Sequence, residues 1–297
     1  MNWYGVAAGK PGFRGRDDMN IEWKDFKRRK DFLICIDSDG CAMDTMDIKH
    51  IRCFGPCMVE EWGLERWADT ILSRWNEINL YTMTRGINRF LGLAMALKEI
   101  NDTYCPIDGI EEYEAWTKEA SELSNHALKT TVLTAKGPCL TKALAWSNKV
   151  NAAVDALPDE DIKPFDGVVS GLAAAHTFAD VAIVSSANRE AVMEEWKRCG
   201  LLPYVDVLCS QDTGSKAYCI KELKAQGYPP DHILMVGDAP GDAAAAFHNG
   251  VYFYPILVKH EHQSWKEFCE IALEKLKYGN YSQYGEEVYL RFLRNLE

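Results

Sequence analysis

A short apolar run that stops at two carboxylates constrains this chain more than any other feature. Residues 32–36 (FLICI) carry no charge, which predicts a short strand that is buried on both faces. The run is followed by Asp37, Ser38, Asp39 and Gly40. Side chains two positions apart on an extended chain point the same way. Two such carboxylates repel each other, so we expect a cation between them or a proton on one. An ordinary Asp/Ser/Gly turn after a strand is the alternative interpretation.

The composition indicates a soluble globular protein. Of the 297 residues 47% are apolar and 26% are charged, which is enough for a substantial core. The net charge of −11 argues against nucleic acid and against an anionic membrane surface as partners. No apolar run is long enough to span a bilayer, and residues 1–16 lack the apolar segment of a secretory leader. The sequence predicts no particular oligomeric state.

The cysteines favour a cytoplasmic location. The chain has ten, scattered singly and without any C-x2-C pair. Cys53 and Cys57 are the closest two, and no second pair completes a zinc site. Free thiols at this density are typical of a reducing cytoplasm.

The hydrophobic period changes twice along the chain. From about residue 48 to 164 it is helical; Ile71, Trp75 and Ile78, for example, fall on one stripe. From residue 181 short apolar runs alternate with helical segments, which predicts a parallel sheet covered on both faces. The predicted strands here are 181–184, 204–208, 232–236 and 251–254, and the predicted helices include one ending at Trp196, 215–225, 243–248 and most of 265–297.

These patterns predict an α/β fold with a Rossmann-like parallel sheet and a large α-helical domain inserted after the first strand. An unstructured insertion of more than a hundred residues is implausible, so it should be a folded domain. We expect residues 1–47 and 165–265 to form the α/β core, 48–164 the helical domain, and 266–297 a helical extension packed on the core.

Polar residues follow the later strands as well. Ser185 ends one strand, and the amide of Ser186 lies next to it, where a helix start would suit a phosphate. Lys216 begins another helix, and Asp238 follows a third strand, four residues ahead of Asp242. Each has an ordinary explanation as a cap, a surface lysine or a turn. Together, three carboxylates in one crevice suit Mg²⁺, which prefers oxygen ligands and leaves room for phosphate.

In this order the four features resemble the motifs of the haloacid dehalogenase superfamily of phosphotransferases. The resemblance covers residues 31–44 and 165–256. The D-x-D-G motif is matched by residues 37–40, the Ser/Thr motif by Ser185, the Lys motif by Lys216 with Lys221 as the alternative, and G-D-x-x-x-D by Gly237, Asp238 and Asp242.

The resemblance implies a role for each acid. Asp37 would attack phosphorus and form an aspartyl-phosphate. Asp39 would protonate the leaving alcohol and then deprotonate the water that cleaves the intermediate. The Asp37 carboxylate, the Asp39 backbone carbonyl and Asp238 would hold Mg²⁺, with Asp242 beside them, ion-paired with Lys216 or bonded to a metal-bound water.

The phosphate and the rest of the substrate would be held by other residues. Ser185, Ser186, Gly40 and Lys216 would bind the non-reacting phosphoryl oxygens. In this family a helical cap between the first two motifs closes over the site, so residues 48–164 would be that cap. Arg85 and Arg89, expected on one cap helix behind an N-cap at Thr84, could reach a second anionic group of the substrate. Two surface arginines are the alternative, which we favour.

The implied function is a Mg²⁺-dependent phosphatase of a small phosphorylated metabolite. An acid at Asp39 favours phosphate-ester chemistry over displacement of halide. A phosphomutase of the same family is one alternative. A non-catalytic binding module that keeps the fold is another, and the intact set of acids argues against it.

Overall fold

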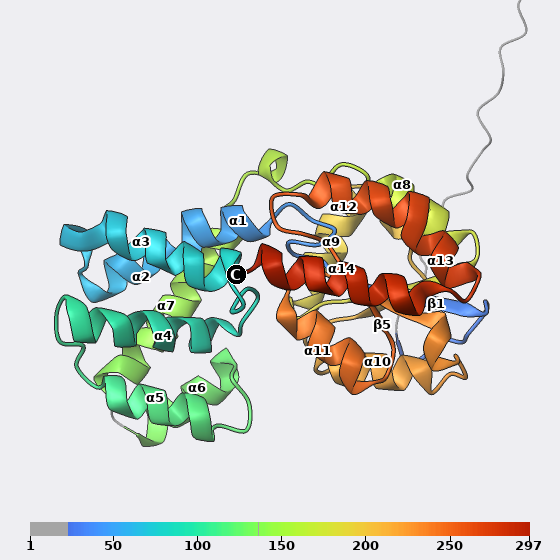
Figure 1. The fold of residues 1–297 in the computed structure, drawn as a ribbon. Helices are drawn as coiled ribbons and strands as arrows, with labels where there is room; N and C mark the ends of the chain where they lie inside the picture. The colour runs from blue at the N-terminus through green and yellow to red at the C-terminus, as the bar shows by residue number, and fades with distance from the viewer. Residues whose placement is uncertain (1–22, 136) are drawn as a thin grey trace, which may run out of the picture.

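The protein has two bodies, an α/β body and a helical body, which lie side by side (Figure 1). The computed structural model describes residues 23–135 and 137–297. Residues 1–22 of the predicted core domain therefore lie outside the described residues. In Figure 1 the helical body is blue to green and the α/β body is mainly yellow to red.

Within the described residues, five parallel strands form one sheet. They are β1 (Phe32–Ile36), β2 (Ala179–Val184), β3 (Val207–Cys209), β4 (Ile233–Gly237) and β5 (Tyr252–Pro255), in the order β3-β2-β1-β4-β5. The strand order reverses between β1 and β4, which is where open parallel sheets bind ligands. The predicted α/β fold with a parallel sheet is confirmed.

The register aligns the carboxyl ends of the three central strands. Ile36 of β1 lies opposite Ile183 of β2 and Val236 of β4. The residues that follow these positions therefore emerge at one edge of the sheet. This alignment brings together segments that are some two hundred residues apart in the sequence.

Helices cover both faces of the sheet. One face carries α8 (Val168–His176), α9 (Arg189–Arg198), α12 (Glu261–Glu267), the π-helical segment η7 (Phe268–Ala272) and α13 (Leu273–Lys277); the other carries α10 (Lys216–Lys224) and α11 (Pro240–His248). Strand β1 alternates between them, with Ile34 and Ile36 in the first cluster and Leu33 and Cys35 in the second. The strand is thus buried on both faces, as predicted.

The C-terminal helix α14 (Tyr281–Asn295) lies along β5 and contributes to both clusters. Its first half packs with the α8 side, and Phe292 and Leu296 pack with the α10 side. Figure 1 shows α14 in red, running across the front of the α/β body toward the helical body.

The helical body has its own hydrophobic core. Its helices are α1 (Met46–Lys49), α2 (Gly55–Trp62), α3 (Ala68–Asn76), α4 (Arg89–Thr103), α5 (Ile110–Glu119), α6 (Asn125–Thr134) and α7 (Pro138–Asp155), with π-helical segments η1 (His50–Phe54) and η3 (Glu77–Tyr81). The predicted stripe of Ile71, Trp75 and Ile78 is buried in this core. The helical content fits a cap domain.

Three predicted elements differ from the structure. The strand predicted at 204–208 is shorter and later, because Leu202–Tyr204 forms a 3₁₀ turn around Pro203, which has no amide hydrogen to donate to a strand. The helix predicted at 243–248 begins earlier, with Pro240 in its first turn. The helix predicted to start beside Ser186 and to end at Trp196 is α9, which runs from Arg189 to Arg198. Its N-cap is Asn188, whose side chain accepts a hydrogen bond from Ala191 N.

All ten cysteines are free. None of the described helices combines the length and the apolar character that a membrane span requires. The prediction that the cysteines form no disulfides agrees with this arrangement.

Trp265 of α12 ties the C-terminal helices to the loop that follows β1. It is fully buried, and its Nε1 donates a hydrogen bond to the Cys41 carbonyl at 2.9 Å. The loop that carries Asp39 therefore depends on a side chain more than two hundred residues later.

Replacing Trp265 with Phe should remove this hydrogen bond and leave the buried Cys41 carbonyl unpaired. We expect Trp265→Phe to lower the free energy of unfolding by about 1–3 kcal/mol more than Trp75→Phe does. Trp75 is a matched control because it is equally buried and its Nε1 has no partner among the described residues. Urea denaturation of both variants measures the difference, and equal losses would contradict the role of the hydrogen bond.

Candidate functional site

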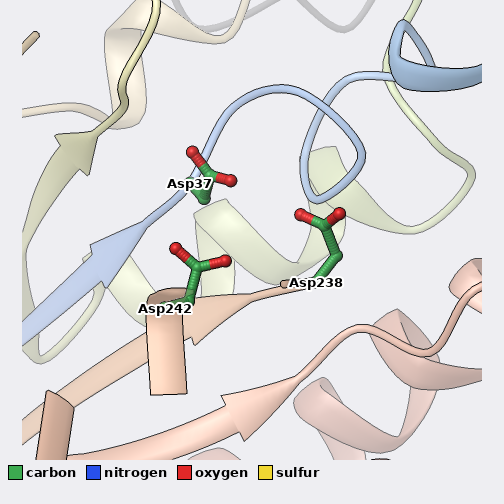
Figure 2. A group of neighbouring side chains, drawn as sticks. All are labelled: Asp37, Asp238 and Asp242. Carbon is green, nitrogen blue, oxygen red and sulfur yellow. The ribbon is translucent and has the colours of Figure 1, made fainter. Parts of the chain in front are cut away.

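Three carboxylates gather at the carboxyl edge of the sheet. Asp37 follows β1, Asp238 follows β4, and Asp242 lies in the first turn of α11 (Figure 2). One oxygen from each lies within 4.8 Å of the others, and all three residues are buried. The register of β1 and β4 is the cause, since Asp37 N donates a hydrogen bond to the carbonyl of Val236 at 3.0 Å.

Lys216 joins two of these acids. As the first residue of α10, it places Nζ 2.9 Å from Asp37 Oδ2 and 2.6 Å from Asp242 Oδ1. Burial alone would lower the pKa of Lys216, but Asp242 and Asp37 outweigh it and hold the pKa above its ordinary value. The alternative candidate, Lys221, is exposed and lies a turn further along the same helix.

The remaining negative charge favours a cation. Burial raises the pKa of Asp37 well above its ordinary value, although Lys216 opposes the shift. Burial also raises the pKa of Asp238 to about 6, with Asp242 adding to the effect and Arg85 opposing it. Both carboxyls therefore lack enough positive charge around them to ionise easily.

The donor set fits a hard divalent cation. Among the described residues, the buried Asp238 Oδ1 has no hydrogen-bond partner, so one oxygen remains available in a site where unpaired polar atoms are costly. Asp37 and Asp238 supply the oxygen ligands that Mg²⁺ prefers. Asp242 is engaged with Lys216 and with the amide of Ala239, which suits a place beside the metal.

Asp39 points away from this cluster and into a second network. Its Oδ1 accepts hydrogen bonds from Thr45 Oγ1 at 2.5 Å and from Lys49 Nζ at 2.7 Å. Lys49 Nζ also lies 3.2 Å from Glu195 of α9. Burial raises the pKa of Asp39, but Lys49 and Thr45 outweigh it and leave the pKa below its ordinary value. Asp39 is therefore ionised at neutral pH.

The predicted phosphate-binding residues Ser185, Ser186 and Gly40 differ in burial and in their hydrogen bonds. Ser185 is buried behind β2, and its Oγ accepts a hydrogen bond from Ala187 N at 3.1 Å. Ser186 does not lie at the helix start as expected, because α9 begins three residues later, at Arg189. Ser186 is exposed, and the Gly40 amide already donates to the Met43 carbonyl at 2.8 Å.

The two predicted cap arginines take different places. They do not share a helix, because Gly86 adopts a φ of 67° and α4 begins only at Arg89, with Asn88 rather than Thr84 as the N-cap. Arg85 lies in the preceding turn and its Nε donates to Asp238 Oδ2 at 2.7 Å. The favoured interpretation, two surface arginines, is wrong for Arg85, which is 3% exposed.

Arg89 remains within the helical body. Its Nη1 donates to Asn151 Oδ1 at 2.7 Å and to Ser147 Oγ at 3.2 Å, and its guanidinium lies over the Phe54 ring. Nearby His50 is buried, and burial, with Arg85 and Arg89 adding to the effect, lowers its pKa to about 3. This side of the site is thus cationic without the histidine.

A cavity of about 390 Å³ lies where the chain crosses between the two bodies. Arg85, which pairs with Asp238, is part of its wall, whereas the three clustered carboxylates do not line it. The size suits a small ligand. The other lining residues include Asp44, Asp47, Lys163, Asp166, Lys259 and Glu261.

Sequence reasoning missed Lys49, Thr45 and Glu195. A lysine ten positions after Asp39, at the start of the helical segment, has no feature that distinguishes it from a surface lysine. Glu195 is equally ordinary in an amphipathic helix. Only the tertiary structure brings Asp39, Lys49 and Glu195 together, through the two ion pairs of Lys49.

Comparison with known proteins identifies the family. A model of the haloacid dehalogenase-like hydrolases matches residues 70–256, more than half of the chain. The chain belongs to this family. The match begins after Asp37 and Asp39, so their place in the hydrolase rests on the strand pairing described above. No curated protein matches the sequence.

Solved structures similar to this hydrolase come from several bacteria. A haloacid dehalogenase-like protein from Streptococcus pneumoniae is 12% identical, with 83% of this chain and 97% of that chain covered and a TM-score of 0.47. A family hydrolase from Xanthomonas campestris is 11% identical (87% and 97% covered, TM-score 0.48). A proposed family hydrolase from Bacillus subtilis, solved with bound magnesium, is 12% identical (76% and 86% covered, TM-score 0.45).

Removing Lys49 should destabilise the hydrolase in a pH-dependent way. Lys49→Met leaves Asp39 and Glu195 as mutually repelling, mostly buried carboxylates, so we expect a loss of about 3 kcal/mol of unfolding free energy near pH 7. In the native protein the lowered pKa of Asp39 stabilises the fold above the unfolded pKa of about 4, and this contribution is lost as the pH falls.

In the variant the sign reverses for Asp39, which loses its cation. The pKa of Glu195, which burial and Asp39 already raise in the native protein, should rise further because Lys49 no longer opposes the shift. The difference between Lys49→Met and the native protein should therefore shrink between about pH 7 and about pH 4, as protons neutralise the acids. Chemical denaturation across this range measures it. Lys149→Met, which breaks surface pairs with Glu60 and Glu61, is the control and should change little at any pH. A pH-independent loss in Lys49→Met would contradict the electrostatic explanation.

Proposed function

We propose that this hydrolase is a Mg²⁺-dependent phosphatase that cleaves a small phosphorylated metabolite through an aspartyl-phosphate. One observation carries the proposal: Asp37 and Asp238 converge on one point, with Lys216 2.9 Å from Asp37. An oxygen nucleophile, a ligand pair for a hard cation and a fixed ammonium are the parts that phosphoryl transfer needs.

Asp37 is the proposed nucleophile. Its Oδ2 is held by Lys216, so the carboxylate is oriented before substrate arrives. When bound by Asp37, Asp238 and the Asp39 carbonyl, Mg²⁺ would offset the negative charge of nucleophile and phosphate. Ser185 and Lys216 are proposed to hold the phosphoryl oxygens; the Ser185 hydroxyl hydrogen remains free for this, since its oxygen is the acceptor in the bond from Ala187.

Asp39 is the proposed acid and base. Its ionised form, paired with Lys49, suits the second step, in which it accepts a proton from the attacking water. For the first step it needs a proton, and the dianionic phosphate favours this because a nearby negative charge raises a carboxyl pKa. The helical body, as the proposed cap, would cover the leaving group, and the cavity beside Arg85 offers room for a small one.

A panel of small phosphomonoesters tests the function. We expect at least one to release phosphate in the presence of Mg²⁺, and a chelator to stop the release. Isomerisation of a sugar phosphate without release would indicate a phosphomutase instead. Neither release nor isomerisation across the panel would favour a binding module and overturn the proposal.

Two substitutions separate the proposed roles. Asp37→Asn should abolish release and prevent acid-stable labelling of the protein by the phosphoryl group, because an amide cannot form the intermediate. Asp39→Asn should lower kcat by about 100- to 10,000-fold, the usual size of an acid–base contribution. Asp69→Asn, the same change at an exposed position of α3, is the control. Full activity in Asp37→Asn would exclude it as the nucleophile.

A further inference from the structure

Arg85 is a cation of the helical body that is buried in the α/β body. Its side chain and that of Asp238 are each 1% exposed, and their Nε and Oδ2 atoms are 2.7 Å apart. Arginine is rarely this buried unless it is paired. Its Nη1 donates in addition to the Leu80 carbonyl at 2.7 Å, so the guanidinium is held from both sides.

Two glycines, Gly40 and Gly86, allow the backbone to pack closely around this arginine and Asp238. A Cβ added to Gly40 would lie 2.6 Å from Arg85 Nη2 and 2.5 Å from Asp238 Oδ2, so a larger residue would displace the pair. A Cβ added to Gly86 would lie 2.7 Å from the Ala239 side chain. Both glycines also have positive φ values, 78° and 67°. The turn at residues 82–88 therefore packs directly on the segment that carries Asp238.

A neighbouring contact holds the same turn. Lys259 of the α/β body places its Nζ 4.2 Å from the centroid of the Tyr81 ring. The Tyr81 hydroxyl donates to Asp47 Oδ2 at 2.9 Å. Tyr81 is the last residue of η3 and precedes the turn, so these two contacts help to hold Arg85 next to Asp238.

Arg85 and a divalent cation need the same carboxylate. The cluster contains three carboxylates, of which Lys216 already pairs with Asp37 and Asp242, and Arg85 pairs with Asp238. A divalent ion at Asp238 would lie within a few ångströms of a buried guanidinium. Like charges at this separation repel strongly where water is excluded.

We infer that Arg85 is an internal counter-ion of the metal site, which leaves Asp238 when the cation binds. This rests on the proposed function, because it assumes the metal site described there. Binding of the metal and packing of the turn at residues 82–88, with Arg85 paired to Asp238, then oppose each other. This coupling is reciprocal. The cation loosens the turn, and the turn with Arg85 paired to Asp238 lowers the affinity for the cation. Arg85 thus links the state of the cap to the state of the metal site.

Calorimetric titration with Mg²⁺ alone, without substrate, tests the inference. Arg85→Met should bind Mg²⁺ at least about tenfold more tightly than the native protein, within the usual range of such couplings. Arg74→Met is the matched control, since Arg74 pairs with Glu77 and Glu99 on the outside of the helical body. The affinity of the Arg74→Met variant for Mg²⁺ should equal that of the native protein. Equal or weaker binding by Arg85→Met would overturn the inference and indicate that Arg85 orients Asp238 for the metal.

Hydrogen exchange on the native protein provides a second measurement that requires no variant. The amides of Arg85 and Ile87 donate within the turn, at 2.8 and 3.1 Å, and the amide of Gly86 donates to the Asn79 carbonyl of η3 at 3.4 Å. Saturating Mg²⁺ should accelerate their exchange, whereas the amides of α5 serve as an internal control and should not change. Unchanged or slower exchange in the turn, with Mg²⁺ demonstrably bound, would overturn the inference. If neither the native protein nor either variant binds Mg²⁺, the proposed metal site is wrong, and the inference that rests on it is wrong as well.

Discussion

The pairing of β1 with β4 brings Asp37 and Asp238 next to each other, and the charge balance at this point is the constraint on which the rest of the structure depends. Buried carboxylates that repel each other would destabilise any fold unless cations offset them. Lys216 offsets part of the charge from α10, and Arg85 offsets part of it from the helical body. The unpartnered oxygen of Asp238 marks where the balance is incomplete.

The helical body contributes charged side chains to the candidate site of the α/β body. It supplies two of the cations near the carboxyl edge of the sheet, Lys49 on Asp39 and Arg85 on Asp238. Each is mostly buried in the contact between the two bodies. Any movement that separates the bodies would expose these acids to water and change their pKa values.

Much of the fold could be predicted because local patterns and packing agree. The run at residues 32–36 became β1 with the predicted bounds, since an uncharged β-branched segment has one favourable place in a parallel sheet. Prediction failed where a single residue overrides the pattern. Pro203 shortens the strand predicted at 204–208, and Gly86 breaks the helix predicted through Arg85.

The candidate site divides in the same way. Asp37, Ser185, Lys216 and Asp238 could be found because each follows a strand or begins a helix, and strand ends in a parallel sheet converge. The partners of these residues could not be found. Lys49, Glu195 and Arg85 reach the site through long-range contacts that no spacing in the chain encodes.

The sequence by itself determined the parallel α/β sheet, the helical insertion and the acids at the strand ends, because periodicity and strand-end chemistry are local properties. Only the tertiary structure decided which cation neutralises which acid. Ion pairing depends on distances of a few ångströms between side chains of different bodies, and those distances follow from packing of the whole chain. That is why two arginines four residues apart, Arg85 and Arg89, lie in different environments.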